Sequence, residues 1–121
     1  ASHSSDTREG TGNLDLRAFE LYVRGAGGST EEAARRFLES LAGEQRALAT
    51  AMAGENAAEV ARVAHRLHAL AGLIDAREIT ELARRLQALP EEKLSAEHRS
   101  LVDALIVAAE KLATAIGAYG R

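Results

Sequence analysis

The 121-residue sequence contains no cysteine, no tryptophan and a single proline. The absence of cysteine excludes disulfide bonds and thiolate metal sites, and it suits a reducing compartment. A chain of this length fits one domain and can bury a working core without such cross-links. We therefore expect one domain that is stabilised by the packing of its side chains.

Two further absences narrow the range of partners. No apolar run approaches the roughly 20 residues that a membrane span requires, and no signal-peptide pattern is present. The net charge of −3 leaves no basic patch of the kind that binds nucleic acid. We expect neither direct contact with a membrane nor binding to nucleic acid.

Helix-forming residues dominate the sequence, which is 46% hydrophobic but only 3% aromatic. Residues 1–13 are polar and lack periodicity, so we expect them to be disordered; their opening Ala1-Ser2-His3 is typical of a cloning remnant. From Leu14 onward, apolar residues recur three and four apart, which predicts a series of helices. The expected ranges are about 15–24, 30–53, 56–74 and 75–89, with a last helix from about 95 that ends within 117–120.

Capping residues and helix breakers mark the expected helix ends. The predicted caps are Ser29 or Thr30, Asn56, Asp75 and Ser95. Gly54 and Pro90 are expected to end the second and fourth helices. Four amphipathic helices with short connections predict an all-α fold over residues 14–121. We expect an antiparallel up-down-up-down four-helix bundle with a short extra N-terminal helix.

The third predicted helix carries a histidine on the face turned away from the core. With ~100° between successive residues, the apolar stripe of this helix lies opposite His65. The residues within ~40° of His65 are small: Ala58, Ala61, Ala69 and Gly72. Arg62 and His68 lie at ~60° on either side of it. Because an exposed helix face ordinarily carries long polar side chains, we interpret this one as a docking surface for another protein.

The imidazole of an exposed histidine suits phosphoryl transfer. Near neutral pH such a ring is largely unprotonated, so one of its nitrogens can attack an activated phosphoryl group. Phosphoryl transfer depends mainly on alignment and charge neutralisation, which Mg²⁺ on a partner can supply. We therefore expect no metal, no cofactor and no autonomous catalysis in this domain.

The run from Val63 to Ala76 resembles a known signature, that of the histidine-containing phosphotransfer (HPt) domain, which reads approximately A-H-x-L-K-G-x-x-x-x-I-G-A. The positions that match it without a gap are Ala64, His65, Leu67, Ile74 and Ala76. The resemblance extends from residue 14 to about residue 116. It includes Leu14-Asp15-Leu16, Phe37-Leu38 and Gly54-Glu55-Asn56.

The resemblance implies a place in a two-component phosphorelay. His65 would accept a phosphoryl group from an aspartyl phosphate on a response-regulator receiver domain, which holds Mg²⁺, and pass it to another receiver. Such domains often form the C-terminal module of a hybrid sensor histidine kinase, or act as small separate proteins. We expect a cytoplasmic location, either free or tethered to the inner membrane through a parent kinase. The complete core favours a monomer.

Three positions depart from the family pattern. His68 replaces a lysine and can help to neutralise a phosphoryl group only when it is protonated. Ala69 replaces a glycine and adds one methyl group to the docking surface. Asp75 replaces a later glycine, where we expect it to act as a helix cap. The first departure leaves open a degenerate HPt-like domain that binds a receiver or an enzyme and regulates it without phosphotransfer.

Other interpretations of the histidines are possible. A second alignment gives the reactive role to His68, but it requires a three-residue deletion before Ile74. A metal clip formed by His65 and His68 is disfavoured, because Zn²⁺ takes three or four ligands. His98 is expected to be exposed and without function.

The arginines beside His65 have two alternative roles. Arg62 and Arg66 either form a phosphate-binding rim or pair with nearby Glu59 on a solvated face.

Overall fold

The computed structural model describes residues 15–119. Its helices are α2 (Leu16–Ala26), α3 (Thr30–Ala53), α4 (Ala57–Gly72), α5 (Arg77–Gln87) and α6 (Ala96–Tyr119), and these residues contain no strand. The prediction of an all-helical bundle is confirmed, and each helix end lies within three residues of its predicted position. The expected disordered segment, residues 1–13, lies outside the described residues.

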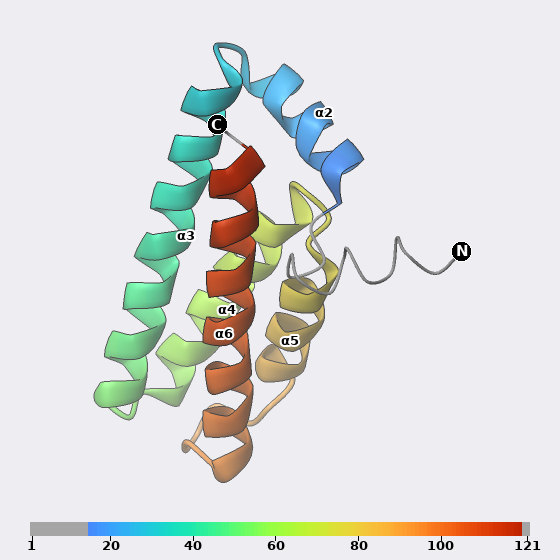
Figure 1. Ribbon diagram of the computed structural model, residues 1–121. Coiled ribbons are helices and arrows are strands. Elements are labelled where there is room, and N and C mark those ends of the chain that lie inside the picture. The colour runs from blue at the N-terminus through green and yellow to red at the C-terminus, as the bar shows by residue number, and fades with distance from the viewer. Residues whose placement is uncertain (1–14, 120–121) are drawn as a thin grey trace.

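The helices α3, α4, α5 and α6 form a closed ring. In this ring α3 contacts α4, α4 contacts α5, α5 contacts α6, and α6 contacts α3. The colours in Figure 1 show the direction of the chain, which runs down α3, up α4, down α5 and up α6. The short α2 lies across the upper end of the ring, where it contacts α3 and where α6 also ends.

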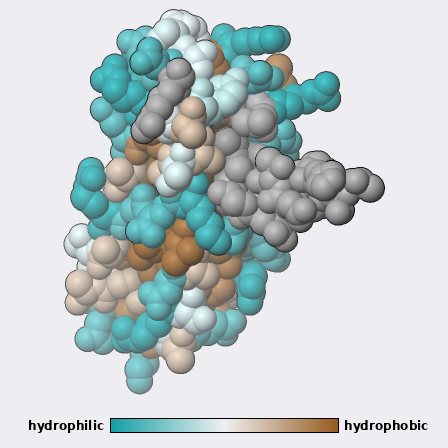
Figure 2. All heavy atoms as spheres, in the orientation of Figure 1, coloured by the Kyte–Doolittle hydropathy of each residue, from teal (hydrophilic) through white to brown (hydrophobic). Residues whose placement is uncertain are grey.

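The core between these helices consists mostly of aliphatic side chains. The largest side chains with almost no exposed surface are Phe19, Phe37, Leu41, Leu48, Leu67, Ile74, Ile79, Leu86, Leu105, Leu112 and Ile116. Burial of one such side chain contributes about 1.5–3 kcal/mol. On the face drawn in Figure 2, hydrophilic side chains cover much of the surface, and apolar ones show between them in patches. The packing of the amphipathic stripes therefore accounts for the bundle.

Aromatic side chains hold α2 on the end of the bundle. The ring of Phe19 is buried, and its centre lies 6.2 Å from that of Tyr22 and 5.1 Å from that of Tyr119 on α6. Tyr22 packs edge to face against Phe37 of α3 at 5.7 Å. The Tyr119 hydroxyl also donates a hydrogen bond to the Glu20 carboxylate at 3.1 Å. The two phenylalanines and two tyrosines of the sequence thus join α2 to both α3 and α6.

Polar caps begin α3 and α4 as predicted. The Ser29 hydroxyl accepts a hydrogen bond from the backbone N–H of Glu32 at 3.0 Å. The side-chain oxygen of Asn56 accepts one from the N–H of Glu59, also at 3.0 Å. Each cap satisfies an N–H group that has no partner within the first helical turn. Between Ser29 and Thr30, the structure therefore assigns the cap of α3 to Ser29.

The start of α6 confirms one prediction and corrects another. Ser95 is the predicted cap, and its hydroxyl accepts a hydrogen bond from the N–H of His98 at 3.2 Å. His98 was expected to be exposed, but only 2% of its surface is accessible. Its Nδ1 accepts a hydrogen bond from the N–H of Ser95 at 3.0 Å. His98 thus takes the place that glutamate fills in a capping box, and this reciprocal pairing explains its burial.

The prediction that Asp75 caps α5 is wrong. The residue at the cap is Ala76, which has no side chain able to accept a hydrogen bond, and the Asp75 carboxylate instead lies 3.5 Å from Nε of Arg77. Asp75 has a φ of 52°, in the left-handed region. The N–H of Asp75 bonds to the carbonyl of Gly72 at 3.3 Å, and that of Ala76 to the carbonyl of Ala71 at 3.0 Å. This is a Schellman motif, in which Asp75 ends α4 rather than starting α5.

The end of α3 repeats this motif. The helix ends beside Gly54 as predicted, but Gly54 has an ordinary φ of −85°. The left-handed residue is Glu55, with a φ of 52°. Its N–H bonds to the carbonyl of Met52, and the next N–H, of Asn56, bonds to that of Ala51. Both turns that flank α4 therefore place an acidic residue where glycine is the usual choice.

Candidate functional site

His65 lies in the middle of α4 with its side chain exposed. The residues on the opposite face of the helix are buried and anchor α4 to the core: Val60, Val63, Leu67 and Ala71. This backing holds the backbone under His65 in place. The ring therefore stands on a rigid element, as a group that must meet a partner in a defined geometry requires.

Gln87, the last residue of α5, orients the His65 ring. Its amide oxygen lies 3.3 Å from Nδ1 of His65, and its amide nitrogen donates to the carbonyl of Ala83, also at 3.3 Å. Because an amide oxygen only accepts hydrogen bonds, Nδ1 must carry the proton in this contact. In the neutral ring, Nε2 then keeps its lone pair. The contact thus selects the tautomer whose nucleophilic nitrogen is Nε2.

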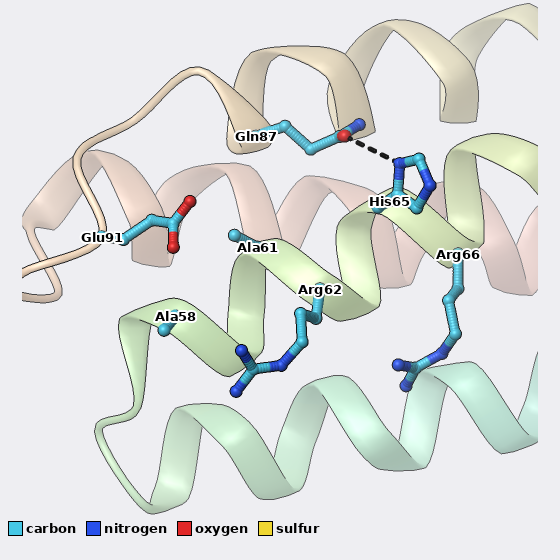
Figure 3. A pocket seen from close by; sticks show the side chains of 7 residues that line it. All are labelled: Ala58, Ala61, Arg62, His65, Arg66, Gln87 and Glu91. Carbon is cyan, nitrogen blue, oxygen red and sulfur yellow. Dashed lines mark hydrogen bonds between the residues drawn. The ribbon is translucent and has the colours of Figure 1, made fainter.

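A surface hollow of about 440 Å³ lies beside His65, and we call it the His65 hollow. It is lined by Ala58, Ala61, Arg62, His65, Arg66, Gln87 and Glu91. Figure 3 shows His65 and the Gln87 amide at one end of it and Glu91 at the other. Of the half-buried alanines on α4, Ala61 lies between these ends and Ala58 lies near the Glu91 end. Their methyl groups leave the hollow open to another molecule.

The structure separates the small residues of α4 into two groups. Ala58 and Ala61 line the His65 hollow, whereas Ala69 and Gly72 lie further along α4, outside its lining. Both of the latter are exposed. A Cβ added at Gly72 would meet no atom within 4 Å, so no neighbouring group covers this part of the helix surface. A partner that covers all four residues would contact α4 on both sides of His65.

Two arginines line the hollow, and both are paired with carboxylates. Nε of Arg62 lies 2.7 Å from Oε1 of Glu59, and Nε of Arg66 lies 2.9 Å from Oε1 of Glu44 on α3. In Figure 3 both side chains point away from the Gln87 side, to which His65 turns. The expected pair with Glu59 is found for Arg62, but the same expectation for Arg66 is wrong, because the packing of α3 against α4 brings Glu44 to Arg66. Exposed pairs of this kind contribute only about 0–1 kcal/mol, so an incoming phosphoryl group can compete for the guanidinium groups.

His68 lies one turn after His65, is half-buried and does not line the His65 hollow. Within residues 15–119, no group of three or more histidine, aspartate or glutamate side chains is placed to hold a metal ion. None of the described helices combines the length and apolar character that crossing a membrane demands. Of the two histidines on α4, His65 is the one that is exposed and that has its ring oriented by Gln87.

Sequence reasoning missed Gln87, Glu44 and Glu91. Gln87 and His65 are 22 residues apart, as are Glu44 and Arg66, and each pair meets only because neighbouring helices pack together. No local spacing in the sequence reports such a contact. To find these residues, one would have to know which of the predicted helices pack against each other.

Comparison with models of protein families shows to which family the chain belongs. The family model described as Hpt domain matches residues 32–117, which is more than half of the sequence. The chain therefore belongs to the HPt domain family, whose members serve histidine phosphotransfer in two-component phosphorelays and interact with response-regulator receivers. No curated protein and no solved structure matched the chain in the same comparisons.

Proposed function

We propose that this domain is a phosphocarrier that accepts a phosphoryl group on Nε2 of His65 from a receiver aspartate and passes it to a second receiver. The observation that carries the proposal is the contact between His65 and Gln87, which favours the tautomer with the lone pair on Nε2 of an exposed ring. The all-helical bundle, proposed to be an antiparallel four-helix scaffold, supplies the rigid support. The receiver would contribute the Mg²⁺.

The transfer step uses the two ring nitrogens differently. The Nε2 lone pair forms the N–P bond while the P–O bond to the aspartate breaks, and the aspartate carboxylate leaves with the electron pair. Nδ1 keeps its proton, so the ring becomes positively charged. The amide oxygen of Gln87 accepts from Nδ1–H and stabilises that charge. Attack by an aspartate of the second receiver on phosphorus reverses the step and restores the neutral ring.

Neighbouring residues would assist in two ways. Arg62, and His68 when protonated, would offset the negative charge of the phosphoryl group. The small residues would let the receiver approach the ring closely: Ala58, Ala61, Ala69 and Gly72. The domain is proposed to act as a monomer in the cytoplasm, free or tethered through a parent kinase.

A second candidate is an interaction domain that binds a receiver or an enzyme without carrying phosphate. The observation that favours it is the replacement of the family's lysine by His68, which is half-buried and does not line the His65 hollow. The same docking surface serves both candidates, so a chemical test has to separate them.

The test is label transfer from a phosphorylated receiver to this chain, compared between His65→Gln and His68→Gln. The phosphocarrier predicts acid-labile label on the wild type and on His68→Gln, and none on His65→Gln. Label that persists in His65→Gln and disappears in His68→Gln would move the reactive role to His68. Measurable receiver binding with no label on any variant would establish the interaction domain.

A further inference from the structure

We propose that Glu91 selects the receiver, because it makes the His65 hollow fit a receiver domain that presents a basic side chain beside an apolar one. The inference rests on the proposed phosphotransfer function, since it concerns the partner of the same surface. The apolar side chain would cover Ala58 and Ala61, and the basic one would reach Glu91.

The position of Glu91 follows from the connection after α5. Glu91 is exposed, lies four residues beyond Gln87 in the connection after α5, and lines the hollow as Gln87 does. Figure 3 shows the Glu91 side chain projecting from this connection toward the part of α4 that carries Ala58 and Ala61. We call the surface formed by Ala58 and Ala61 the alanine floor. A partner side chain that packs on the alanine floor would therefore lie beside the Glu91 carboxylate.

The charged residues that line the hollow differ in whether they form ion pairs. Arg62 is paired with Glu59 and Arg66 with Glu44, whereas Glu91 forms no ion pair with any residue between 15 and 119. The lining itself thus holds two guanidinium groups, each paired with a carboxylate outside the lining, and one carboxylate with no ion pair among the described residues. The next two residues of the connection, of opposite charge to each other, do not line the hollow. The carboxylate at the end of the hollow away from His65 is therefore the lining charge that is left to pair with a partner.

This distribution of charge fits a particular arrangement of the partner. The phosphoryl group is anionic and must lie at the His65 end, which is separated from Glu91 by the alanine floor. Two methyl groups accept almost any apolar side chain and so discriminate poorly between receivers. A carboxylate at the rim favours a basic group opposite it and repels an acidic one, which affects both association rate and choice of partner.

The test uses a panel of phosphorylated receiver domains. Wild-type protein is first assayed with each, and the receiver that transfers label fastest is kept as the probe. Glu91→Lys and Glu91→Gln are then compared with Glu92→Lys, which makes the same charge change on the next residue, outside the hollow. At low ionic strength we expect Glu91→Lys to lower the second-order transfer rate about tenfold, and Glu91→Gln about threefold, with both losses shrinking in high salt. Glu92→Lys should change the rate by less than about twofold.

A small phosphoramidate donor, which needs no docking surface, should label His65 equally in all three variants and so show that the site is intact. A transfer rate for Glu91→Lys that is unchanged, raised, or lowered only as much as for Glu92→Lys would overturn the selection of a basic partner. In that case, label on the wild type would still support phosphotransfer. No label on the wild type from any receiver would instead overturn the proposed function, and this inference with it.

Discussion

Replacement of Gln87 by alanine should slow phosphoryl transfer through His65 while leaving the bundle folded. The amide of Gln87 makes one hydrogen bond to the reactive ring and one to its own helix, and its side chain is only half-buried. The variant therefore loses little packing. It loses the acceptor that keeps the proton on Nδ1 and that stabilises the positive ring during transfer.

The size of the effect follows from the hydrogen bond. A hydrogen bond strengthens when one of its groups becomes charged, here by about 0.5–1.5 kcal/mol as the ring becomes positive, which corresponds to roughly a two- to twelvefold change in rate. The separation of 3.3 Å between Nδ1 and the amide oxygen is longer than in a strong hydrogen bond. We therefore expect the lower half of that range, about two- to fivefold.

Two measurements check this reasoning. Long-range ¹H–¹⁵N spectra of the His65 ring should show the Nδ1–H tautomer in the wild type and a mixture of tautomers in Gln87→Ala. Transfer of label from a phosphorylated receiver gives the rate. Arg85→Ala is the matched control, because Arg85 is exposed on the same helix and does not line the His65 hollow. An unchanged tautomer ratio together with an unchanged rate would refute the role of Gln87.

Two further predictions concern stability, measured by urea denaturation. Asp75→Gly should stabilise the bundle by about 0.5–1 kcal/mol, because glycine adopts the left-handed conformation without a Cβ penalty. Asp75→Ala, which keeps the penalty and loses the pair with Arg77, should not, and a gain from alanine would contradict the argument. Ser95→Ala should destabilise by about 1 kcal/mol through loss of the α6 cap. The exposed Ser100→Ala is its control, and equal losses from both would show that the cap contributes nothing specific.

The helices and three of their caps were predictable because their causes are local. Apolar residues three and four apart define a helix face, and Ser29 and Asn56 bond to N–H groups only three residues away. One predicted cap, Asp75, was wrong for a simple reason. A polar residue before a helix resembles a cap in sequence, but Asp75 is held in the left-handed conformation by hydrogen bonds of the preceding turn.

The candidate site was only partly predictable for a related reason. The geometry of a single helix sets His65 opposite the core, and the structure finds it exposed. What the ring contacts depends on α5, and what Arg66 contacts depends on α3. His98 is an intermediate case, because its spacing from Ser95 is visible in the sequence but its burial results from packing around the start of α6.

The sequence by itself determined that this protein is helical, that it has one core, and which face of the third predicted helix carries the histidine. These properties depend on contacts within a helix, whose period of 3.6 residues can be counted along the chain. Only the tertiary structure decided that Gln87 orients His65, that Glu44 engages Arg66 and that Glu91 faces the alanine floor. Those contacts depend on how neighbouring helices lie against one another, which side-chain packing across the whole core sets.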